Sequence, residues 1–178
     1  MNKQKYTIII YSENNIGLLN RITIIFTRRH INIESLTVSS SEIEGLSRFT
    51  IIIDETENNT RKVVTQIEKQ IEVVKAFYYL ESETISQEVA LYKVSKEGMN
   101  QNEFNELVNK NFGTIIEDQN DYFVVIKTGH FEDTESLVNQ IKAKEYKMMQ
   151  FVRSGSVAVT KTKMPVSEIL EKFELKKV

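Results

Sequence analysis

The chain has 178 residues, 40% of them hydrophobic and 27% charged, which is an ordinary globular composition for one large domain or two small ones. The net charge is only -2, and basic and acidic residues are interspersed, so the sequence lacks the basic footprint of a nucleic-acid-binding protein. No apolar run approaches the roughly 20 residues of a membrane helix. No signal-peptide core is evident either, and the cytoplasm is therefore the expected compartment.

Residues 1–80 predict the element order βαββαβ, the split pattern of ferredoxin-like domains. Strands are expected at 6–11, 31–39, 46–54 and 73–80, and helices over 18–26 and 63–71. The strands follow from β-branched, apolar runs, and the helices from apolar residues at i, i+3, i+4 and i+7. Asn14 or Asn15 is expected to cap the first helix. The apolar residues of 31–39 change from odd to even positions between Ile33 and Leu36, which predicts a bulge or bend near Glu34 and Ser35.

The same order recurs after the polar segment 81–87, which is predicted to be a linker. Strands are expected at 89–94, 114–117, 122–128, 148–152 and 157–160, and helices over 104–112 and 137–141. Pro165 is expected to begin a short terminal helix with Ile169, Leu170 and Phe173 inward. The predicted fold class is α+β, with two consecutive ferredoxin-like domains at 1–80 and 88–178.

Groups that could carry catalysis are scattered along the sequence. His30 and His130 each lie near an element boundary without a matching ligand cluster, unlike the ligands of a zinc site. The six glycines are dispersed and form no phosphate-binding loop. The chain is therefore expected to be non-catalytic and to bind no metal.

One strand-to-helix segment, 13–19, is suited to binding a small anion. A helix N-terminus offers free N–H groups and a positive dipole to an α-carboxylate, and Gly17, expected at the second helical position, has no side chain to block close approach. The alternative is that Gly17 allows tight packing of the helix on the sheet. The Asn32 amide could meet both charged groups of an amino acid, or it could be a turn residue that bonds its own backbone.

These residues belong to longer runs that resemble one family. Residues 13–22 (Glu-Asn-Asn-Ile-Gly-Leu-Leu-Asn-Arg-Ile), 32–38 (Asn-Ile-Glu-Ser-Leu-Thr-Val) and 46–50 (Leu-Ser-Arg-Phe-Thr) resemble the ACT domain of acetolactate synthase small subunits. Residues 88–94 (Glu-Val-Ala-Leu-Tyr-Lys-Val) and 152–158 (Val-Arg-Ser-Gly-Ser-Val-Ala) resemble the C-terminal domain of that family more weakly. Together the resemblance covers nearly the whole chain.

The resemblance implies a non-catalytic regulatory subunit that activates a catalytic large subunit and confers feedback inhibition by valine or a related branched-chain amino acid. Thiamine diphosphate, Mg and FAD are expected only in the large subunit, so this chain is expected to hold no cofactor. The family also implies a homodimer through the ACT domains, with valine bound between two chains. By motif position, the implied effector residues are Asn14, Ile16, Gly17, Leu18, Asn32, Ile33 and Leu36.

Two other functions remain open from the sequence. A free-standing amino-acid sensor that acts as a transcription regulator would need a helix-turn-helix or a basic surface, and neither is evident. A small ferredoxin-fold enzyme would need a reactive constellation of side chains, which the sequence does not show.

Overall fold

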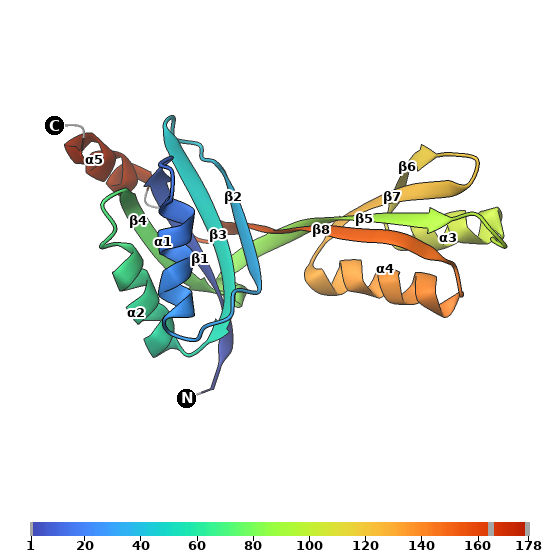
Figure 1. Cartoon of the computed structure of the whole chain (residues 1–178), viewed down its shortest axis with the longest axis horizontal. Coiled ribbons are helices and arrows are strands. Elements are labelled where there is room, and N and C mark those ends of the chain that lie inside the picture. Colours follow the sequence, from blue (N-terminus) through green and yellow to red (C-terminus); the bar gives the residue numbers. More distant parts are fainter. Residues whose placement is uncertain (1, 164–165, 177–178) are drawn as a thin grey trace. The chain divides into compact units, whose positions relative to one another are not determined.

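The computed structural model describes residues 2–163 and 166–176 and divides them into two compact units (Figure 1). One unit contains the described residues up to Ile85 and those from Ser156 onward, and the other contains Ser86–Gly155. The elements are β1 (Gln4–Glu13), α1 (Leu18–Thr27), β2 (Ser35–Ser40), β3 (Leu46–Glu55), α2 (Glu57–Ile67), β4 (Val73–Leu80), η1 (Glu81–Glu83), β5 (Thr84–Ser95), α3 (Gln101–Lys110), β6 (Thr114–Asp118), β7 (Tyr122–Gly129), α4 (Phe131–Ala143), β8 (Met148–Thr160) and α5 (Val166–Lys176).

The first unit is built on a four-stranded sheet in the order β2-β3-β1-β4, with antiparallel neighbours. Helices α1 and α2 cover one face (Figure 1). Alternate residues of β1, including Ile8 and Ile10, enter the core under these helices, because successive side chains of a strand point to opposite faces. Ile9 and Tyr11 therefore face the other side, where they pack with Ile169 and other apolar residues.

Helix α5 contributes the predicted inward residues Ile169 and Phe173 to that second core. Leu170 was also expected to face inward, but 41% of its surface is exposed, so that prediction was wrong. The predicted helix start at Pro165 lies outside the described residues.

The second unit repeats the topology, with a four-stranded sheet in the order β6-β7-β5-β8. Its core takes Ala90, Tyr92 and Val94 from β5 together with residues of α3, α4 and β7. Val89 and Leu91, which alternate with these residues along β5, are each 38% exposed. The two consecutive βαββαβ patterns are confirmed.

The structure places several boundaries differently from the sequence analysis. Residues 31–34 precede β2 instead of forming part of it, so Ile31 and Ile33 reach the core from a loop. The predicted irregularity near Glu34 and Ser35 is a bend at Glu34, and not a bulge within a strand. Ile71 lies beyond the end of α2 with 85% of its surface exposed. β8 is one continuous strand where two short strands were expected.

The segment 81–87 also differs from the predicted linker. It forms the short 3-10 turn η1 and the first residues of β5, and the Lys161 N–H donates to the Glu83 carbonyl at 2.9 Å. The chain thus leaves the first unit along β5 and returns to it along β8. This return explains why residues after Ser156 belong to the first unit and not to a C-terminal domain over 88–178.

Candidate functional site

The start of α1 is an open helix N-terminus shaped by Gly17. Gly17 is the N-cap residue, with φ 84° and ψ -7°, a left-handed conformation that glycine adopts without steric cost. A Cβ atom built on Gly17 would have nothing within 4 Å. The alternative of tight helix-on-sheet packing is therefore wrong, and so is the predicted cap by Asn14 or Asn15, since no side chain among the described residues caps this helix.

The first turn of α1 leaves backbone donors free of helical partners. The first bond of the helix joins the Arg21 N–H to the Gly17 carbonyl at 3.1 Å. The N–H groups of Leu19 and Asn20 therefore make no helical hydrogen bond. The first turn contains no acidic residue. This end of the helix therefore carries an uncompensated positive dipole that suits a carboxylate.

The predicted effector residues around this turn differ in exposure. Asn14 is exposed, and Ile16 is fully so, at 105% of its reference area. Leu18 is only 2% exposed and belongs to the core under α1. Leu18 thus holds the helix on the sheet, whereas Asn14, Ile16 and Gly17 form an accessible surface.

Asn32 lies just beyond the opposite end of the same helix. The Ile31 N–H donates to the Phe26 carbonyl at 3.1 Å, which closes the last turn of α1. The exposed Asn32 side chain donates from its amide to Glu34 Oε1 at 2.7 Å. Asn32 is therefore a polar loop residue whose amide bonds a neighbouring carboxylate, whereas the turn interpretation predicted a bond to its own backbone.

Ile33 lies in the loop before β2 and Leu36 lies in its first residues, and both are partly buried against the core of the first unit. Leu36 is paired with Ile51 in β3. The two residues provide apolar surface close to Asn32.

Within a single chain, the predicted site residues fall into two groups that lie apart. Asn14, Ile16 and Gly17 lie at the start of α1, and Asn32 lies past its other end. A helix of 10 residues is about 15 Å long, which exceeds the length of one free amino acid. One copy of the chain therefore does not bring all the predicted residues to one ligand.

The edge of the first sheet lies beside these groups. β2 is the first strand in the order β2-β3-β1-β4, with β3 as its one neighbour in the described part of the chain. Val38 on β2 and Leu19 on α1 are 43% and 47% exposed. An edge strand with exposed apolar side chains is a template for pairing with another chain.

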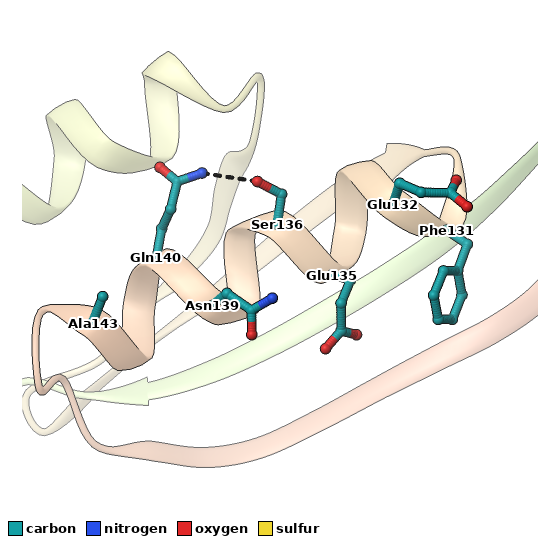
Figure 2. A pocket seen from close by; sticks show the side chains of 7 residues that line it. All are labelled: Phe131, Glu132, Glu135, Ser136, Asn139, Gln140 and Ala143. Carbon is teal, nitrogen blue, oxygen red and sulfur yellow. Dashed lines mark hydrogen bonds between the residues drawn. The ribbon is translucent and has the colours of Figure 1, made fainter.

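The second unit carries a shallow groove along α4, far in sequence from these residues. Its volume is ≈ 520 Å³, and its lining includes Phe131, Glu135 and Gln140. Figure 2 shows that the labelled side chains all project from one helix, with Gln140 donating to Ser136 Oγ at 3.1 Å. The groove contains none of the predicted effector residues.

Two further properties concern the whole described chain. Across residues 2–163 and 166–176, no group of three or more His, Cys, Asp or Glu side chains could hold a metal ion. Over the same residues, no helix is long and apolar enough to cross a membrane.

Comparison with known proteins gives the family. Residues 8–75 match the family model described as the AHAS small subunit-like ACT domain, and residues 87–162 match the model of the small subunit of acetolactate synthase. An acetolactate synthase small subunit of Bacillus subtilis is 34% identical over 146 residues, which cover 82% of this chain and 84% of the relative. The chain belongs to the acetolactate synthase small-subunit family.

Other members of the acetolactate synthase small-subunit family agree over similar lengths. A probable acetolactate synthase small subunit of Archaeoglobus fulgidus is 31% identical over 157 residues, covering 88% of this chain and 97% of the relative. The crystal structure of the small subunit from Thermotoga maritima matches with a TM-score of 0.81 at 28% identity, over 90% of this chain and 99% of that chain. The first domain is thus an ACT domain, as the sequence predicted.

The sequence analysis gave no separate role to three polar residues within the small-subunit motifs. Ser35 and Thr37 alternate with apolar residues on β2, and Arg48 lies on the neighbouring strand β3. The alternation was the available signal, because it places these side chains on the face of the sheet opposite α1 and α2.

Proposed function

We propose that the chain is the regulatory subunit of acetolactate synthase in branched-chain amino acid biosynthesis. It has no catalytic activity of its own, associates with the thiamine-diphosphate-dependent large subunit, raises its activity and confers feedback inhibition by valine. The large subunit contributes thiamine diphosphate, Mg and FAD. The cytoplasm is the compartment in which the pair would act.

The observation that carries the effector proposal is the uncapped start of α1. The open space at Gly17 admits a ligand to the backbone, and the free N–H groups of the first turn would bind its α-carboxylate. The Asn32 amide would meet the polar end of the ligand, and Ile33 and Leu36 would contact the isopropyl group.

The separation of the two groups supports a site shared by two chains. If two copies pair through their β2 edges about a two-fold axis, the start of β2 in one chain approaches the far end of β2 in its partner, because the paired strands are antiparallel. The α1 N-terminus of one chain then comes to the same side as Asn32 of the other. A symmetric dimer of this kind contains two equivalent sites.

The alternative is a free-standing ACT-domain amino-acid sensor. This function would use the same ligand groups but would need no large subunit. The two proposals therefore differ in partner and not in the chemistry of the site.

The test is reconstitution with the large subunit from the same organism. The isolated chain is expected to form no acetolactate from pyruvate, to raise the rate of the large subunit when the two are mixed, and to make that rate sensitive to valine. Calorimetry on the isolated chain should show valine binding. Turnover by the chain alone would refute the non-catalytic role, and valine binding without association with the large subunit would favour the free-standing sensor.

A further inference from the structure

Three side chains on the sheet of the first unit hold the last residues of β8. Ser35 Oγ accepts a hydrogen bond from the Ser156 N–H at 2.8 Å, and Thr37 Oγ1 donates to the Ser156 carbonyl at 3.0 Å. Arg48 Nη2 donates to the Ala158 carbonyl at 2.7 Å. We call Ser35, Thr37 and Arg48 the β8 clamp, and all the residues that it joins belong to the first unit.

The clamp supplies partners that β8 lacks within its own sheet. β8 is the last strand in the order β6-β7-β5-β8, so its second edge has no strand neighbour in the described chain. Backbone groups on a strand edge need other partners when they are removed from water. Side chains of β2 and β3 take this role at Ser156 and Ala158, and they fix one position of β8 along the clamp.

Arg48 is anchored in one geometry. Its guanidinium carbon lies 5.8 Å from the centre of the Tyr11 ring, and the Tyr11 hydroxyl donates to Glu42 Oε1 at 2.6 Å. Burial raises the pKa of Tyr11 well above its usual value, which keeps the phenol protonated as a donor. Within the described residues Arg48 forms no ion pair and its buried Nε has no hydrogen-bond partner, so losing the Ala158 carbonyl would leave the cation still less satisfied.

Two of the clamp residues, Ser35 and Thr37, lie on β2, the strand that also carries the predicted effector residue Leu36. Successive side chains of β2 alternate between faces, so Leu36 packs toward α1 and α2, while Ser35 and Thr37 on either side of it bind Ser156. In the part of the chain that the structure describes, β2 is an edge strand with one neighbour. A ligand that displaces Leu36 therefore also displaces the two clamp residues beside it.

We propose that the β8 clamp is the relay through which an effector bound beside Leu36 changes the position of β8, the strand that continues into the second unit at Gly155. Ser35, Thr37 and Arg48 act as positioning residues and do not contact the effector. This inference rests on the proposed function, because it takes valine as the ligand and the large subunit as the responding partner. The relay requires an equilibrium between two positions of β8. A ligand shifts this equilibrium only if its affinity for the protein differs between the two positions, and the clamp distinguishes the two positions through its hydrogen bonds.

The test is a double variant, Ser35→Ala with Thr37→Val, which removes the hydroxyls and changes little volume. Ser39→Ala is the matched control, because Ser39 lies on the same face of β2 and has no side-chain hydrogen bond within the described residues. Melting temperatures establish that the variants fold. Valine affinity is measured by calorimetry, exchange of the Ser156 amide by NMR, and valine inhibition in the reconstituted holoenzyme.

In the wild type and in Ser39→Ala, valine is expected to change exchange of the Ser156 amide, which reports the clamp directly. The double variant is expected to bind valine with an affinity within a few-fold of wild type. Its holoenzyme should need at least about tenfold more valine for half inhibition, within the range of coupling common in allosteric proteins. Arg48→Gln, which removes the bond to Ala158, should act in the same direction.

The outcomes separate the two levels of the proposal. Absence of valine binding to the wild-type chain would overturn the proposed function, and the relay with it. Valine binding with normal inhibition in the double variant would overturn the relay alone. Equal loss of inhibition in Ser39→Ala would also overturn it, because the effect would then be general to this face of the sheet.

Discussion

Replacing Gly17 by Asp tests the effector site most directly. An aspartate at this position places a carboxylate beside the α-carboxylate that the start of α1 would bind. At a separation of about 4 Å the repulsion is roughly 1 kcal/mol in water and about 4 kcal/mol at an effective dielectric constant near 20. Valine affinity should therefore fall roughly 5- to 1,000-fold, since each 1.4 kcal/mol is a factor of ten.

The structure also changes the expected effect of this substitution on stability. Asp is favourable near a helix N-terminus by about 0.3–1 kcal/mol, but the φ of 84° at the N-cap residue Gly17 costs a residue with a Cβ about 1–2 kcal/mol. The Cβ itself meets open space, so no further clash is added. The net loss of about 1 kcal/mol corresponds to a melting temperature lowered by about 2–4 °C, which leaves the domain folded.

Two matched variants separate charge from strain. Gly17→Asn has the same backbone strain without the charge, and it should retain most of the valine affinity. Gly98→Asp places the same residue at φ 69° in open space in the second unit, so it should lose stability without losing valine binding. The assay is calorimetry with valine, together with activation and valine inhibition of the reconstituted enzyme. Unchanged valine inhibition in Gly17→Asp would remove Gly17 from the site.

Three further predictions concern stability. The Thr56 N–H donates to Glu55 at 2.6 Å, and this bond is the main reason that the pKa of Glu55 is lowered. The ionised carboxylate therefore stabilises the fold at neutral pH, and this stabilisation is lost as pH falls below about 4.5. Chemical denaturation should show that Glu55→Gln lowers the free energy of unfolding by about 1 kcal/mol at pH 7, and that the difference from wild type disappears in acid. Lys127→Met should lose about 1–3 kcal/mol in the same assay, because the Lys127 ammonium caps the Asn111 carbonyl at the end of α3; no loss would contradict that role. Phe112→Asn should raise the melting temperature, with up to about 1 kcal/mol gained, because Phe112 is 90% exposed at φ 55°; a lower melting temperature would show that the ring stabilises the fold.

Phe112 also illustrates where local sequence rules were insufficient. Glycine usually adopts the left-handed conformation after a helix, a rule that predicts that Gly113 ends the helix before it. In the structure Phe112 adopts it, while a Cβ on Gly113 would lie 3.0 Å from a methyl group of Val108. The glycine is thus required by close packing, and this requirement depends on tertiary structure that the sequence does not reveal.

The element order was predictable because apolar periodicity distinguishes strands from helices locally. The division of the chain was not, since it depends on contacts between distant residues. Val157 to Thr160 was correctly expected to be extended, but its neighbours in the first unit come from positions more than 100 residues earlier, as in the bond from Arg48 to Ala158. Similarly, the sequence placed Gly17 at a helix start. The distance between Gly17 and Asn32 became known only from the direction and length of α1 in the structure.

That separation leads to a complementation prediction for the shared site. Asn32→Ala removes the amide and should weaken valine binding, as Gly17→Asp does, so each homodimer carries two damaged sites. If Gly17 of one chain and Asn32 of its partner form each site, a mixed dimer contains one doubly damaged site and one intact site. Equal amounts of the two variants, after random exchange, should therefore recover about one quarter of the wild-type sites at wild-type affinity, as two-fold symmetry requires. Calorimetry on the mixture measures this fraction. If both residues acted within one chain, every site would keep one defect, and mixing would restore none.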